Sequence, residues 1–182
     1  MKYLLFLNIV LFSTLLFGKK FDGYYITNEN DTIEAQIRIE VNFIDPSIIK
    51  ISTIKQKVSV FVNGKKKRFK PFEIKEFHIY EQGGITFKPI KLGKKSIFAK
   101  VEVEGALSVY VYGTTDLYGG MEFSNYVVKY SDKDPQWVGS KKQLLNYLNS
   151  ETTYFEERFE TSAGNWGDLL ISFAQDYNNL EK

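Results

Sequence analysis

Few residues in this chain have the side chains that catalysis or metal binding most often uses. The 182 residues include one histidine, His78, and no cysteine. The lack of cysteine excludes a disulfide framework, a thiol nucleophile and a thiolate zinc site. His78 stands between Phe77 and Ile79 in an expected strand, and the sequence has no nucleophile elbow of the G-x-S-x-G type. We therefore expect a structural histidine, no metal site and no cofactor.

A basic run follows the hairpin signal Asn63-Gly64. It consists of Lys65, Lys66, Lys67 and Arg68. We expect these side chains to contact an anionic partner. The alternative is a solvated hairpin whose lysines only protect an edge strand from pairing with another sheet.

Charge is divided unevenly along the chain. Residues 1–100 hold 18 basic and 9 acidic side chains, whereas residues 101–182 hold 6 and 13. One explanation is that the two halves attract each other in the fold. The other is a dipolar surface whose basic side meets an anionic partner.

Carboxylates supply the other catalytic chemistry that the composition allows. A pair of Asp or Glu side chains suffices for glycoside hydrolysis. The first candidates are Glu102, Glu104, Asp116 and Glu122. Two carboxyl groups roughly 5–10 Å apart in one cleft would favour an enzyme, whereas dispersed carboxylates would favour a non-catalytic module.

The first eighteen residues have the pattern of an export signal. Lys2 precedes an apolar run over 3–17, and Gly18 supplies a small residue for cleavage. As a helix the run would cover roughly 22 Å, which is short of the about 30 Å of bilayer hydrocarbon. We expect residues 1–18 to be a signal peptide, with an uncleaved N-terminal anchor as the alternative. No later stretch has spanning length, so we expect no transmembrane span in the mature chain.

Residues 19–182 are expected to form a single α+β domain. Over about 21–130, apolar and polar residues alternate between turn signals. This pattern predicts about nine strands in an antiparallel β roll or barrel-like sheet. One strand is expected over 48–54 and the last over 122–130. Val and Ile total 28 residues and Ala only 5, which also favours strands.

Over about 137–181 the hydrophobic period becomes helical, which predicts two or three short C-terminal helices. Ser140 and Gln143 form a capping box. A second helix is expected over 153–159, and a third after the cap Asn165. The third has an apolar stripe that must be buried, most simply against the sheet. Its members are Trp166, Leu169, Leu170, Phe173, Tyr177 and Leu180.

Three stretches together are similar to a known pattern. They are Gly23-Tyr24-Tyr25-Ile26 leading to Asp31-Thr32-Ile33, Asn63-Gly64-Lys65 leading to Phe72-Glu73-Ile74-Lys75-Glu76-Phe77, and Phe98-Ala99-Lys100-Val101-Glu102-Val103-Glu104-Gly105 leading to Leu107-Ser108-Val109-Tyr110. The chain resembles a group of uncharacterised, exported, β-rich proteins of Bacteroidota over most of residues 21–180. It departs from that group at Asn30 and Ala35, where the group often has Gly.

The resemblance implies a place in the cell envelope and an architecture, but no activity. It also implies one modification, because bacteria of that phylum attach O-glycans at Asp-Thr/Ser-aliphatic triplets. The triplet Asp31-Thr32-Ile33 matches, which makes Thr32 a candidate for O-glycosylation. The alternative for this triplet is an ordinary turn and strand start.

We therefore expect a non-catalytic, exported, envelope-associated protein that acts as an interaction or structural module. Its expected location is the periplasm or the outer-membrane periphery, or outside the cell. The expected partner is an envelope protein or an anionic glycan, and not nucleic acid. The alternative is a carboxylate-based hydrolase that acts on a glycan or another envelope polymer.

Overall fold

The structure is a computed structural model, and it describes residues 18–42, 44–115, 122–148 and 165–180. Its strands are β1 (Lys19–Ile26), β2 (Thr32–Ile39), β3 (Val58–Val62), β4 (Lys65–Phe69), β5 (Glu76–Ile79), β6 (Ile85–Leu92), β7 (Lys95–Val103), β8 (Leu107–Thr115), β9 (Glu122–Tyr130) and β10 (Gln136–Trp137). Its helices are the 3-10 helix η2 (Ile51–Ile54) and the α-helices α2 (Lys141–Leu148) and α4 (Trp166–Leu180). The expected α+β order, strands first and helices last, is confirmed.

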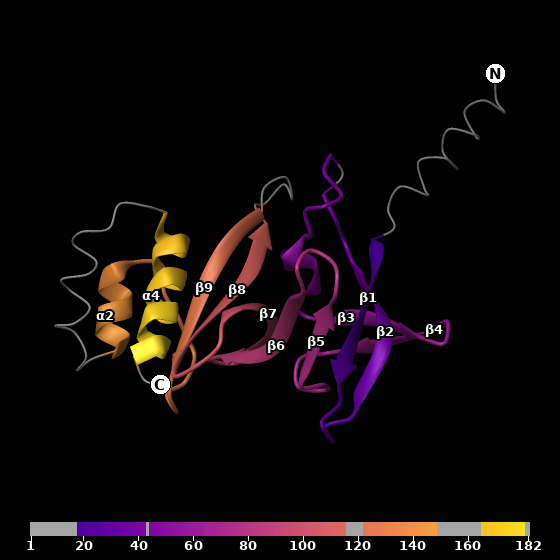
Figure 1. Ribbon diagram of the computed structural model, residues 1–182, viewed down its shortest axis with the longest axis horizontal. Helices are drawn as coiled ribbons and strands as arrows, with labels where there is room; N and C mark the ends of the chain where they lie inside the picture. Colours follow the sequence, from indigo (N-terminus) through magenta and orange to yellow (C-terminus); the bar gives the residue numbers. More distant parts are fainter. Residues whose placement is uncertain (1–17, 43, 116–121, 149–164, 181–182) are drawn as a thin grey trace.

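The ten strands form one antiparallel sheet in the order β10-β9-β8-β7-β6-β5-β1-β2-β3-β4. The sequence predicts about nine strands, and it does not predict β10, because the two residues of β10 are too few to show a sequence period. Since β10 and β4 each have a single neighbour, the sheet is open and the expected barrel-like closure is not confirmed. The helices and the β3–β4 hairpin lie at opposite ends of the longest axis (Figure 1).

The hairpin expected at Asn63-Gly64 is confirmed. Both residues have positive φ, +50° and +75°, as a two-residue turn of this kind requires. The turn between β1 and β2 also uses the left-handed region, since Asn30 has φ +75°. Glycine adopts this conformation most easily, and asparagine tolerates it better than most residues.

The strand expected over 48–54 is wrong. Ile49 makes only an isolated bridge with Val41, and the next residues form η2. A short apolar run does not by itself distinguish a strand from a buried helical turn. Here the Thr53 hydroxyl donates to the Lys50 carbonyl at 2.8 Å, which favours the turn.

The η2 segment lies where β7 and β8 separate. β7 pairs with β8 only from Lys100 onward. Before that point the backbone N–H of Phe98 donates to the Lys55 carbonyl at 2.8 Å. Gly113 of β8 makes the close approach possible, because a Cβ there would lie 2.5 Å from the Ser52 nitrogen. The chain from η2 to β3 therefore fills the place beside the first half of β7.

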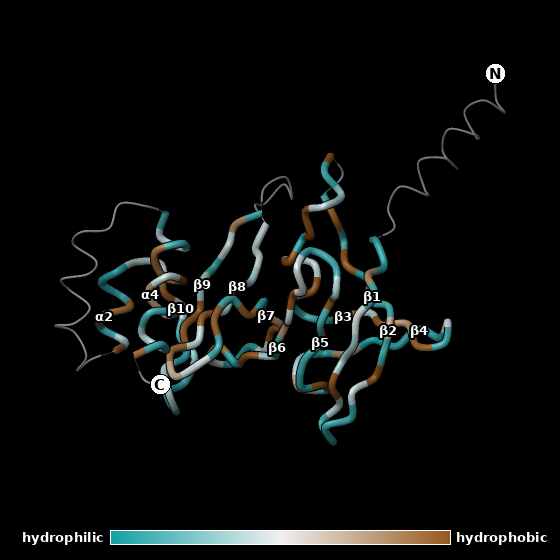
Figure 2. The backbone as a smooth tube through the Cα atoms, viewed as in Figure 1, coloured by the Kyte–Doolittle hydropathy of each residue, from teal (hydrophilic) through white to brown (hydrophobic). Residues whose placement is uncertain are grey.

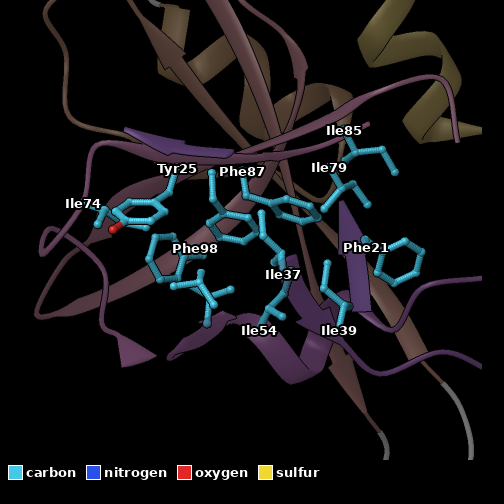
Figure 3. Close-up of a cluster of buried hydrophobic side chains, with 13 residues drawn as sticks. Phe21, Tyr25, Ile37, Ile39, Ile54, Ile74, Ile79, Ile85, Phe87 and Phe98 are labelled. Carbon is cyan, nitrogen blue, oxygen red and sulfur yellow. The ribbon is translucent and has the colours of Figure 1, made fainter. Parts of the chain in front are cut away.

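The largest core cluster joins β1, β2, β3, β5, β6, β7 and η2 (Figure 3). Phe77 stacks on Phe87 with ring centroids 4.7 Å apart and meets Phe98 edge-on at 5.2 Å. Hydrophobic and hydrophilic residues are interspersed along these strands (Figure 2). One face of this half of the sheet is therefore packed, and the other carries polar side chains.

The two α-helices cover the opposite half of the sheet. Phe173 of α4 is 5% exposed and belongs to one cluster with Val109 of β8 and Val128 of β9. The expected burial of the α4 stripe is thus confirmed at its centre, although Leu180 is 64% exposed. The expected cap is also confirmed, since the Gly167 N–H donates to Asn165 Oδ1 at 3.0 Å. The helix expected over 153–159 lies outside the described residues.

The capping box before α2 is present in a modified form. The Gln143 N–H donates to Ser140 Oγ at 3.4 Å, as expected. The Gln143 side chain, however, accepts from the N–H of Gly139 at 2.7 Å, one residue earlier than in the standard motif. At the other end of the helical layer, Asn178 makes two hydrogen bonds of 2.9 Å with the backbone of Leu107, which fix α4 to the start of β8.

Candidate functional site

The basic run of the edge hairpin is divided between the two faces of the sheet. Lys65, Lys66, Lys67 and Arg68 are all exposed and all lie in β4. Lys66 and Arg68 pair with Phe61 and Ser59, whereas Lys65 and Lys67 pair with Val62 and Val60. Since successive residues of a strand point to opposite faces, only Lys66 and Arg68 lie on the outer, polar face.

Other basic residues join this pair through strand pairing. Arg38 of β2 lies opposite Ser59, and Lys20 of β1 lies opposite Arg38. Lys57 precedes β3, and it lines a hollow of about 240 Å³ together with Arg38, Lys66 and Arg68. We call Lys20, Arg38, Lys57, Lys66 and Arg68 the basic surface. It brings together three residues that the sequence analysis did not select.

The electrostatics of the basic surface favour an anion. The pKa of Lys66 lies below its usual value because of partial desolvation and because Arg68, Arg38 and Lys57 repel its proton. Glu40 is the one acidic side chain among the described residues that line the hollow. A bound anion would relieve the repulsion among these cations, since close like charges disfavour the protonated form of lysine.

An aromatic ring supports two of the lysines. The Nζ atom of Lys20 lies 4.0 Å from the centroid of Phe61, and that of Lys66 lies 6.0 Å from it. A ring face attracts an ammonium group through its quadrupole. Phe61 thus holds the ammonium groups of β1 and β4 above the same face of the sheet. One sequence signal for this surface was available: Arg38 falls on the polar side of the alternation in β2.

Thr32, the candidate for O-glycosylation, is accessible. It is exposed and is the first residue of β2, where it pairs with Ile26. The preceding turn is held by Thr27, whose Oγ1 accepts from the Asp31 N–H at 3.2 Å. A glycan on Thr32 would therefore extend from the end of a hairpin without entering the core.

His78 belongs to a layer of aromatic side chains on the same outer face. Its ring stacks on Tyr24 with centroids 5.1 Å apart, and its Nδ1 lies 2.9 Å from the Thr86 hydroxyl. Tyr80 completes the layer at 5.6 Å from His78. These contacts orient the imidazole against neighbouring strands.

The carboxylates of the hydrolase alternative are only partly brought together. Glu102 and Glu122 line one cleft of about 830 Å³, on the side of η2 that holds Ser52. A register irregularity between Val101 and Val103 occurs at Glu102, and such bulges often redirect a side chain. Both carboxylates have partners: Glu102 pairs with Lys100 at 2.8 Å, and Glu122 accepts the Ser52 N–H at 2.5 Å.

The other two acidic candidates do not join that cleft. Glu104 forms an ion pair with Lys88, which also contacts Glu76 at 3.4 Å. Asp116 lies outside the described residues. The described part of the chain contains no group of three or more His, Asp or Glu side chains arranged to hold a metal ion. None of the described helices is long and apolar enough to cross a bilayer.

No protein-family model, curated protein or solved structure matches this chain.

Proposed function

We propose that this chain is a non-catalytic, exported protein of the cell envelope that holds an anionic partner, such as an acidic glycan, on its basic surface. The observation that carries the proposal is the convergence of Arg38, Lys57, Lys66 and Arg68 around one hollow. Partial desolvation and repulsion from the other three cations together hold the pKa of Lys66 below its usual value. Anion binding turns that unfavourable arrangement into a favourable one.

The position of the basic surface supports this proposal. The β3–β4 hairpin lies at one end of the long axis and the helices at the other (Figure 1). The basic surface therefore lies at the end of the long axis that is opposite to α2 and α4. Export rests on the signal-peptide pattern of residues 1–18.

Two charge-matched double variants test the proposal. Lys66→Gln with Arg68→Gln removes two cations from the outer face, and Lys65→Gln with Lys67→Gln removes two from the other face of the same strand. All four side chains are exposed, so each variant should fold. Cosedimentation with purified envelopes at low and high salt measures the result.

We expect the outer-face variant to bind about 2- to 30-fold more weakly than the wild type at low salt. This is the effect of losing two exposed charge pairs with the partner. The inner-face variant should bind like the wild type. Wild-type binding should also fall as salt rises, because exposed charges are screened over about 8 Å at physiological ionic strength. Equal binding by both variants would contradict the assignment, and increased aggregation of both would favour the edge-protection alternative.

The hydrolase alternative is supported by one observation, the shared cleft of Glu102 and Glu122. Its test is the release of new reducing ends from envelope polysaccharide by purified protein. Glu102→Gln and Glu122→Gln should abolish that release if the two carboxylates act as a catalytic pair. Glu104→Gln, outside the cleft, is the matched control. No reducing ends from the wild type would refute the hydrolase.

A further inference from the structure

A larger cleft, of about 930 Å³, lies on the other side of the η2 segment. It opens where β8 diverges from the first half of β7, so its walls come from well-separated parts of the chain. We call it the aromatic cleft. The lining residues that matter here are Lys55, Lys70, Lys95, Tyr112, Thr114 and Trp137. Its volume is near the upper end of the range of about 300–1,000 Å³ that ligand sites occupy.

Two aromatic side chains face the aromatic cleft from the side of the sheet that the helices leave uncovered. Trp137 pairs with Val127, which in turn pairs with Tyr110, and Tyr112 follows two residues later on the same face. The indole of Trp137 is held close to the backbone at Gly139, since a Cβ there would lie 2.7 Å from the ring. The residue nevertheless remains 45% exposed, which leaves ring surface free for a ligand.

All the charged side chains among the described residues of the aromatic cleft are basic. Lys55 Nζ lies 5.5 Å from the centroid of Tyr112. In the described part of the chain, Lys55, Lys70 and Lys95 form no ion pair with a carboxylate. The described residues that line the cleft include no Asp or Glu. Three unneutralised ammonium groups around a concave apolar surface concentrate positive potential inside it.

We propose that the aromatic cleft binds an acidic saccharide, a stretch of polysaccharide that carries hexuronic acid units. The apolar C–H face of a pyranose ring stacks on an aromatic face, for which Tyr112 and Trp137 are available. The sugar hydroxyls find hydrogen-bonding partners in Ser96, Thr114 and Gln136. The carboxylates pair with the lysines.

A phosphate ligand fits the aromatic cleft less well. The described lining has no arginine fork and no helix N-terminus, two features that often hold phosphate in proteins. The three lysines instead come from three segments: after η2, after β4 and at the start of β7. This arrangement suits charges that are spread along a chain of sugars. The inference goes beyond the proposed function, because it concerns a separate site and does not depend on the basic surface.

The probes are trigalacturonate and a neutral trisaccharide of the same ring number, titrated into the full chain by calorimetry and by Trp fluorescence. Trp137→Ala should raise the Kd for trigalacturonate about two- to twelvefold, the value of one aromatic stacking contact. Lys95→Gln should raise it about two- to fivefold, the value of one exposed charge pair. The neutral trisaccharide should bind more weakly than trigalacturonate. The ratio of the two Kd values should become smaller at high salt.

Matched controls separate the cleft from general effects on the fold. Phe123→Ala removes an aromatic residue that is 51% exposed on β9, outside the cleft, and Lys91→Gln removes an exposed lysine of the β6–β7 hairpin that does not line it. Both should bind trigalacturonate within about twofold of the wild type, as surface changes away from a site usually do. Circular dichroism of all variants verifies the fold.

The inference is overturned if trigalacturonate does not bind, if the neutral trisaccharide binds as tightly, or if folded Trp137→Ala binds like the wild type. Two measurements distinguish a failure of the aromatic cleft proposal from a failure of the proposed function. The outer-face variant of β4 should leave the Trp fluorescence change caused by trigalacturonate unchanged, because that signal reports on Trp137 in the cleft. Trp137→Ala should leave envelope cosedimentation through the basic surface in place.

Discussion

Replacing Phe173 with alanine tests whether the sheet and α4 are held together as the structure indicates. Phe173 is 5% exposed and packs with Leu170 and Tyr177 of its own helix against Val109 and Val128 of the sheet. Truncation removes a buried phenyl ring and leaves a cavity that a backbone anchored to two strands closes only in part. Substitutions of this kind lower the free energy of unfolding by about 3–5 kcal/mol.

For a chain of this size, a change of 1 kcal/mol in the free energy of unfolding shifts the Tm by about 2–4 °C. Phe173→Ala should therefore melt about 6–20 °C below the wild type when far-UV and near-UV circular dichroism are followed together. Leu180→Ala is the matched control, because it truncates a residue of the same helix that is 64% exposed. Its Tm should stay near that of the wild type. A Phe173→Ala protein with a wild-type melting curve would refute the packing of α4 on the sheet and would indicate that the stripe is a partner-binding face.

Five further outcomes can be measured directly. N-terminal sequencing of protein from the envelope fraction should begin just after Gly18; an intact Met1 on cytoplasmic protein would contradict export. Intact mass analysis of exported protein should show a glycan that Thr32→Ala abolishes. Gly113→Ala should lower the free energy of unfolding by about 1–3 kcal/mol, the usual cost of overpacking, because the new Cβ meets the Ser52 backbone at 2.5 Å; unchanged stability would contradict that close approach. Arg68→Gln should raise the pKa of Lys66 toward its usual value in an NMR titration, since a neighbouring cation contributes to its lowered pKa. For the same reason, anion binding through Lys66 should weaken with rising pH from below the ordinary lysine value of about 10.4.

Local periodicity was sufficient for most of the elements. The strand over 122–130 is β9, and the alternation of Thr32–Ile39 is β2. The helix after Asn165 also follows from its own residues, because the cap and the apolar stripe are both short-range patterns. The sequence was not sufficient where an element is short. Two residues of β10 have no period, and the apolar run before Lys55 is compatible with a strand or a turn.

The functional surfaces depended on the tertiary structure. The sequence placed Lys65, Lys66, Lys67 and Arg68 together, but the pleat of β4 separates them into two pairs. Strand pairing then brings Lys20 and Arg38 beside the outer pair, and the chain before β3 adds Lys57.

Local sequence patterns also could not predict the aromatic cleft. It exists because the η2 segment lies between β7 and β8, and that position depends on a hydrogen bond from Phe98 to Lys55 and on the missing side chain of Gly113. The period of a strand determines which face each residue takes. Which distant residues share that face is determined by register and packing across the whole sheet, and no local pattern carries that information.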